Sequence, residues 1–180
     1  EVDDNQELGI PPPPVVERGT EAMKSFLSGI LDALESGHLD LTGLSLTYLV
    51  DQVYDMDNLT SLKLMKNEIK YLPEEFGKLT NLVSLNMQDN LLVRLPMSFT
   101  LLTNLHDLRL SYNQLEELPE ELSYFENLRQ LWISNNSIEL LPYETYRLTS
   151  LTELLCTNNP ILDLPHGLQR LTGIKKLSIE

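Results

Sequence analysis

The sequence predicts an α/β solenoid in which short parallel strands stack side by side, and three observations support this prediction. A pattern of 23 residues recurs without insertion or deletion from residue 36 to residue 180. Each copy has two apolar residues separated by one other residue, which is typical of a short strand with one buried face. An amphipathic segment over residues 20–35 precedes the first copy and is expected to form a capping helix over its open end.

The repeat divides residues 36–180 into units of constant length. The unit reads L-x-x-L-x-L-x-x-N-x-L-x-x-L-P, followed by eight further residues. Six units are complete and a seventh begins, with first residues Ser36, Leu59, Leu82, Leu105, Leu128, Leu151 and Ile174. The first unit has Leu44 in place of the asparagine and Val50 in place of the proline, as is usual for a terminal repeat.

Three sets of positions predict the shape of one unit. The fourth and sixth positions are apolar between polar neighbours, so each unit is expected to add one strand to a parallel sheet. The ninth position is Asn67, Asn90, Asn113, Asn136 and Asn159. An amide both donates and accepts, so we expect a ladder of asparagines bonded to the backbone. The fifteenth position is Pro73, Pro96, Pro119, Pro142 and Pro165. Proline lacks an N–H, which indicates an irregular or short-helical convex side.

These residues resemble the leucine-rich repeats of the 23-residue type with a Leu-Pro step, such as those of Scribble-type, Ras-suppressor-type and plant intracellular Ras-group-related proteins. The resemblance covers residues 36–180. It implies a horseshoe with a parallel β-sheet on the concave side, and it implies that the concave sheet binds protein partners.

The two ends of the chain differ from the repeats. The apolar stripe expected on the helix over residues 20–35, between an N-cap at Thr20 and Gly37, consists of Met23, Phe26, Leu27, Ile30, Leu31 and Leu34. A membrane or partner helix is the rival interpretation, but the segment has hardly any cations. Residues 1–19 are acidic and hold four consecutive prolines, so we expect an extended tail or linker. The seventh strand starts without a cap, which favours a piece of a longer protein.

The formal net charge of −14 is shared by both parts of the chain, with −6 over residues 1–35 and −8 over residues 36–180. Such a surface repels phosphate backbones and anionic lipid, so we expect neither nucleic acid nor a membrane as a ligand. A basic or mixed protein surface is the expected partner. No apolar run approaches the roughly 18 residues of a membrane span. The single cysteine favours a reducing compartment, and a cytoplasmic location is predicted.

No group of residues predicts catalysis, a metal site or a cofactor. The histidines His38, His106 and His166 occupy unrelated positions of the repeat and are not expected to converge. Cys156 replaces a leucine at an inward position and is expected to be buried. The glycines form no phosphate-binding loop, and the paired glutamates on turns are typical of a solvated face. We expect no enzyme and no small-molecule substrate.

The outward strand positions predict where a partner binds. Bulky residues gather at successive fifth positions, where Arg109, Trp132 and Leu155 are expected about 4.8 Å apart. Residues of these types often dominate binding energy at interfaces. The predicted partner-binding residues of the concave face are Arg109, Tyr112, Trp132, Leu155, Lys63, Asn86 and Asn135. The rival interpretation is that Arg109 only stacks on Trp132 as a local cation–π pair.

The predicted function is a protein–protein interaction module, which the resemblance refines to an intracellular signalling scaffold or adaptor. Two alternatives stay open. One is a structural component of a large cytoskeletal or ciliary assembly, and the other is the substrate-recognition arm of a larger enzyme.

Overall fold

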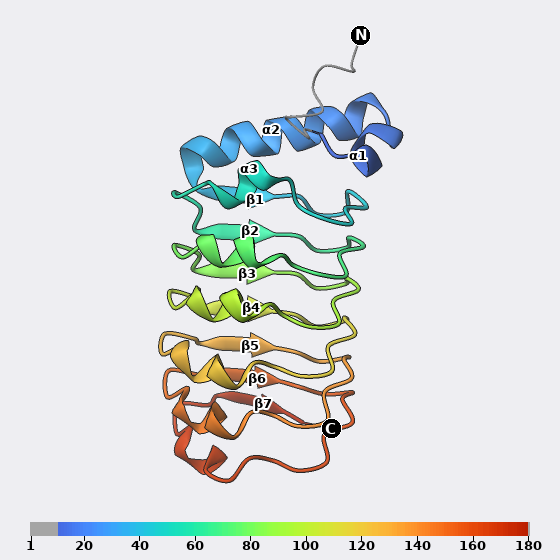
Figure 1. The fold of residues 1–180 in the computed structure, drawn as a ribbon. Helices are drawn as coiled ribbons and strands as arrows, with labels where there is room; N and C mark the ends of the chain where they lie inside the picture. Colours follow the sequence, from blue (N-terminus) through green and yellow to red (C-terminus); the bar gives the residue numbers. More distant parts are fainter. Residues whose placement is uncertain (1–10, 180) are drawn as a thin grey trace.

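Seven short strands form one parallel sheet in the computed structural model, which describes residues 11–179. The strands follow one another in sequence order along the solenoid (Figure 1). They are β1 (His38–Asp40), β2 (Ser61–Lys63), β3 (Ser84–Asn86), β4 (Asp107–Arg109), β5 (Gln130–Trp132), β6 (Glu153–Leu155) and β7 (Lys176–Ser178). The predicted solenoid of stacked parallel strands is confirmed.

Equivalent positions of neighbouring units lie opposite each other in the sheet. Leu62 pairs with Leu85 and Lys63 pairs with Asn86, in each case 23 residues further along the chain. Because the unit has constant length, the same register continues to β7. The central leucine of every strand from β1 to β6 is buried. One face of the sheet therefore closes the core, and the other faces solvent.

The predicted ladder of asparagines is present. The Asn90 amide nitrogen donates to the carbonyl oxygens of Leu64, at 2.8 Å, and Met87, at 3.1 Å. Its oxygen accepts a hydrogen bond from the backbone N–H of Ile69 at 3.1 Å. Asn67 makes equivalent bonds into the first unit, which has no ladder asparagine of its own. Each of these side chains satisfies buried backbone groups of two units at once.

Single turns of 3-10 helix form most of the convex side. They are η2 (Glu74–Lys78), η3 (Met97–Leu101), η4 (Glu120–Tyr124), η5 (Tyr143–Arg147) and η6 (Leu168–Arg170). In η2 to η5 the repeat proline directly precedes the first helical residue. The first unit has α3 (Asp51–Tyr54) at this place. Beneath these turns, a row of buried rings contains Tyr54, Phe76, Phe99 and Phe125, with neighbouring centroids 6.0–6.3 Å apart.

Helix α2 (Thr20–Ser36) lies across the end of the solenoid beside β1 (Figure 1). Its residues Phe26, Ile30 and Ala33 are buried in the same core as the first unit. The helix ends at Gly37, whose φ of 70° lies in the left-handed region that glycine adopts without steric cost. Within residues 11–179, no helix combines the length and the apolar character needed to cross a bilayer.

Two expectations for α2 are wrong. The N-cap is Gly19, not Thr20, because the chain enters the helix with a φ of 85°, which favours glycine. The expected apolar stripe is only partly buried, since one side of it packs on the first unit. Leu27, Leu31 and Leu34 lie on the other side and are exposed.

The predicted extended tail over residues 1–19 is also wrong in part, because residues 13–17 form helix α1 (Pro13–Glu17). Pro12 keeps an extended backbone, with φ of −67° and ψ of 154°. The next two prolines occupy the start of the helix, where no N–H is required. Val15 is fully buried, and its burial stabilises the contact with the cap. Residues 1–10 of the predicted tail lie outside the described residues.

Candidate protein-binding surface

The fifth position of each unit projects from the solvent-facing side of the sheet, one residue after the buried leucine. Strand pairing places Trp132 between Arg109 and Leu155. Neighbouring strands are about 4.8 Å apart, so the side chains form one continuous row. The row reads Asp40, Lys63, Asn86, Arg109, Trp132, Leu155 and Ser178. The three bulky members are therefore neighbours in space.

Arg109 lies over the indole of Trp132, with its guanidinium carbon 4.1 Å from the ring centroid. Arg109 Nη2 donates a hydrogen bond to Gln130 Oε1 at 2.9 Å. Trp132 Nε1 donates to Glu153 Oε2 at 3.2 Å, and Lys176 Nζ lies 5.8 Å from the ring centroid. The local cation–π pair of the rival interpretation is therefore present. Both side chains nevertheless stay partly exposed and available to a partner.

Tyr112 and Asn135 occupy the eighth position, where the backbone turns after the strand. This position is left-handed in all complete units, with positive φ at Gly43, Lys66, Asp89, Tyr112, Asn135 and Asn158. Tyr112 has a φ of 58° and is 54% exposed. Asn135 accepts a hydrogen bond from Asn158 Nδ2 at 3.0 Å. Sequence reasoning missed this conformation, although glycine, asparagine and aspartate at one position indicate it.

Lys63 and Asn86 contribute less to the bulky surface than the sequence predicts. Lys63 is exposed. It forms an ion pair at 3.4 Å with Asp40 of β1, the neighbouring strand on the side away from the bulky residues. Asn86 is only 8% exposed, and its oxygen accepts a hydrogen bond from the backbone N–H of Gln88 at 3.1 Å. Since little of Asn86 is accessible, it offers a partner little surface.

The histidines, which could act in catalysis or bind a metal, lie far apart along the repeats. His38 lies in β1, His106 directly precedes β4, and His166 lies on the flank. Within residues 11–179, no three histidine, cysteine or carboxylate side chains are grouped as metal ligands would be. Cys156 is fully buried as predicted, and burial raises the pKa of its thiol to about 11.

The comparisons with known proteins agree with this geometry. Residues 103–143 match the family model for leucine-rich repeats in two copies, and no curated protein matches the sequence. YopM from Yersinia enterocolitica is 30% identical over 88% of this chain and 32% of its own, with a TM-score of 0.69. A Leptospira interrogans leucine-rich-repeat protein is 29% identical over 78% of this chain and 42% of its own, with a TM-score of 0.61.

A third similar structure is the leucine-rich-repeat ectodomain of the plant membrane receptor kinase GASSHO1/SCHENGEN3 from Arabidopsis thaliana, solved in complex with CASPARIAN STRIP INTEGRITY FACTOR 2. It is 27% identical over 79% of this chain and 18% of its own, with a TM-score of 0.71. This chain therefore spans less than half the length of each of these structures.

The fold and the repeat are those of a leucine-rich-repeat solenoid, and residues 103–143 match the family model for these repeats. Proteins with leucine-rich repeats generally act in protein–protein interaction. The finer resemblance to Scribble-type, Ras-suppressor-type and plant intracellular Ras-group-related proteins stays a prediction, because the three similar structures are a Leptospira protein, a Yersinia protein and a plant receptor ectodomain.

Proposed function

We propose that this chain binds a protein partner on its concave face, with Arg109, Trp132 and Leu155 at the centre of the contact. The observation that carries the proposal is a tryptophan on a solvent-facing strand, placed between cations and not packed in the core. Contiguous large side chains with apolar surface outside a core, here Arg109, Trp132 and Leu155, mark interaction sites. Because hydrogen bonds already hold Arg109 and Trp132, less side-chain freedom is lost on binding.

The inferred role is that of an intracellular signalling scaffold or adaptor in the cytoplasm. The resemblance to Scribble-type repeats supports the role, and the single buried cysteine supports a reducing compartment. The Arabidopsis ectodomain solved in complex with CASPARIAN STRIP INTEGRITY FACTOR 2 supports a binding function for this fold. Fractionation of cells that express the native protein tests the location, and recovery in a secreted fraction would contradict it.

The Trp132→Ala variant tests the binding site. Partners are captured from cell extract on the wild-type chain, identified by mass spectrometry, and titrated by calorimetry against both chains. We expect the variant to lose about 2 kcal/mol of binding free energy, about thirtyfold in Kd, because the central anchor is removed. Tyr124→Ala is the matched control, since Tyr124 is an exposed aromatic residue of the convex η4.

The control should bind like the wild type. If Trp132→Ala lowers only thermal stability and leaves Kd unchanged, the stack is a local structural pair and the proposal is wrong. If Tyr124→Ala loses the partner instead, the binding surface lies on the convex side.

A further inference from the structure

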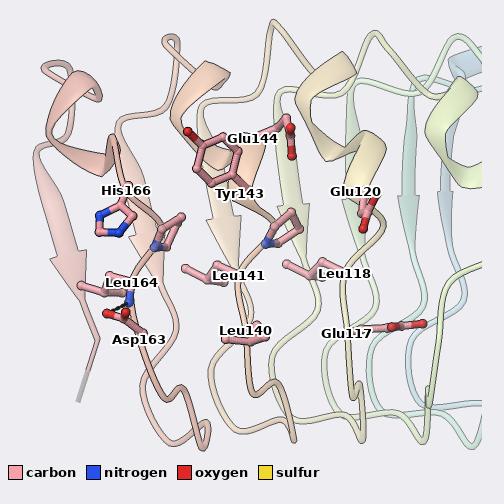
Figure 2. A pocket seen from close by; sticks show the side chains of 12 residues that line it. Glu117, Leu118, Glu120, Leu140, Leu141, Tyr143, Glu144, Asp163, Leu164 and His166 are labelled. Atoms are coloured by element: carbon pink, nitrogen blue, oxygen red, sulfur yellow. Dashed lines mark hydrogen bonds between the residues drawn. The ribbon is translucent and has the colours of Figure 1, made fainter.

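A hollow of about 600 Å³ opens on the flank of the solenoid, where the chain enters η4 and η5 (Figure 2). Three successive units form this hollow. Its lining residues follow the asparagine of each unit, so they lie outside the row of outward-facing residues of the sheet. Its floor is a row of leucines from the fourteenth repeat position, Leu118, Leu141 and Leu164. We call this hollow the flank groove.

At the thirteenth repeat position, acidic and apolar side chains alternate along the flank groove. The middle unit places Leu140 there, between Glu117 of the preceding unit and Asp163 of the following unit. Leu140 is 60% exposed, and the nearby Tyr143 is 58% exposed. The groove therefore presents a central apolar surface with a carboxylate on each side.

The carboxylates of the flank groove form no close ion pair with cations of the described residues. They belong to Glu117, Glu120, Glu144 and Asp163. Within residues 11–179, none of the ion pairs involves them. The pKa of Arg147 is raised chiefly by its hydrogen bond to Tyr146, with a smaller contribution from Glu144. Asp163 Oδ1 accepts a local hydrogen bond from the backbone N–H of Leu164 at 2.8 Å.

We propose that the flank groove binds an extended basic segment of a partner protein, in which an apolar residue lies between two lysine or arginine residues. The apolar residue packs on Leu140 and Tyr143, and the two cations meet Glu117 and Asp163. Alternate residues of an extended chain point the same way about 6.7 Å apart. Neighbouring units lie about 4.8 Å apart, so a segment that crosses the repeats aims every second side chain near a successive unit, and the long lysine or arginine side chains bridge the difference.

Charge decides which occupant fits the flank groove. A second copy of this chain carries a net charge of −14 and is repelled, and so is a nucleic acid backbone. A basic protein segment is attracted, and its apolar residue covers side chains that otherwise contact water. The site is separate from the proposed concave surface and does not depend on it.

The test uses a fluorescein-labelled peptide, Gly-Ser-Arg-Ser-Leu-Ser-Arg-Ser-Gly, titrated with the full chain by fluorescence anisotropy. We expect saturable binding that weakens with salt, and about tenfold weaker binding or worse for a peptide with glutamate in place of arginine. The double variant Glu117→Lys, Asp163→Lys should lose at least about tenfold in affinity. The variant Leu140→Ser should also bind less tightly, because it removes the apolar contact and keeps the charges.

The matched control is the double variant Glu68→Lys, Glu126→Lys, which makes the same charge change at exposed acids outside the groove. It should keep the affinity within about threefold, and Trp132→Ala should bind the peptide like the wild type. Absence of saturable binding would overturn the proposal. Equal losses in the control and in the groove variant would also overturn it, as would full affinity in Leu140→Ser.

Discussion

Tyr112 has two features that are each unfavourable in the free protein. Its backbone is left-handed, and its aromatic ring is exposed to water. Left-handed φ is unfavourable for a residue of this size, whereas the asparagines at the same repeat position tolerate it. Since the repeat imposes this conformation on every complete unit, it is the exposed ring of Tyr112 that indicates a role in binding.

The variant Tyr112→Asn tests this role. We expect the free energy of unfolding to stay constant or to rise by about 1 kcal/mol, because asparagine relieves the strain. Partner affinity should fall, because the ring is lost. Urea denaturation and calorimetry measure the two effects, and a marked loss of stability would instead show that the ring supports the fold.

Cys156 should react slowly with thiol reagents in the native protein. Its pKa of about 11 leaves about one thiol in a thousand ionised at pH 8, and the side chain is fully buried. Labelling with Ellman's reagent with and without urea measures the difference, and rapid stoichiometric labelling without urea would contradict the burial. The unfolded thiol ionises near its ordinary pKa of 9.0. Stability should therefore fall as the pH rises between about 9 and 11.

The turns η2 and η3 approach each other so closely that Gly77 has no space for a side chain. A Cβ atom there would lie 2.5 Å from Ser98 Cβ and 2.6 Å from the Ser98 carbonyl oxygen. We expect Gly77→Ala to lower the free energy of unfolding by about 1–3 kcal/mol. Gly29→Ala in α2 is the contrast, since its Cβ would meet ordinary contacts from 3.4 Å and alanine favours helix. Equal stability of the two variants in urea would refute the steric argument.

The cap should depend on one side of α2 only. Phe26→Ala removes a buried ring and should lower the free energy of unfolding by about 3 kcal/mol or more. Leu31→Ala changes a residue that is 64% exposed and should have an effect below about 0.5 kcal/mol. Thermal and urea denaturation of both variants measure the contrast, which a large effect of Leu31→Ala would contradict.

The sequence predicted the repeating elements from their period and helix α2 from its apolar stripe. Once one strand is placed, the constant 23-residue spacing places the others and their outward residues, from Asp40 to Ser178. Helix α1 could not be predicted in this way, because it occurs once and depends on the burial of Val15. The small exposure of Asn86 depends on a side-chain conformation that no sequence pattern specifies, whereas the stack of Arg109 on Trp132 is the rival interpretation that the sequence had offered.

A second row of asparagines escaped sequence reasoning, although it has the same period. Asn58, Asn81, Asn104 and Asn127 stand at the last position of their units. Asn81 Nδ2 donates to the Asp57 carbonyl oxygen at 2.7 Å, and Asn58 Nδ2 donates to the carbonyls of Ala33 and Leu34 at the end of α2. This row links the outer turns of successive units, and at the first unit it links the cap to the repeats.

At the scale of the whole molecule, stability depends on contacts between neighbouring units, because no single unit buries its own apolar face. The buried asparagine ladder, the row of aromatic rings and the sheet all cross the same boundaries. A defect at one central boundary should therefore weaken the coupling between the two halves of the solenoid.

The variant Asn113→Ala places such a defect in the middle of the ladder. It leaves the N–H of Leu92 without its side-chain partner, and it removes one of the two side-chain donors to each of the carbonyl oxygens of Met87 and Leu110, which keep Asn90 and Asn136. We expect the free energy of unfolding to fall by about 1–3 kcal/mol, because the part-buried N–H of Leu92 loses its acceptor. Amide hydrogen exchange should show faster opening on both sides of the boundary.

The matched control for Asn113→Ala is Asn127→Ala in the second row of asparagines. Asn127 Nδ2 donates a single exposed hydrogen bond of 3.4 Å to the Thr103 carbonyl oxygen. Water replaces this bond easily, so the variant should lose no more than about 0.5 kcal/mol. If both variants lose the same small amount, the buried ladder orients the turns without coupling the units. If Asn113→Ala loses several times more, the ladder couples the repeats into one cooperative structure.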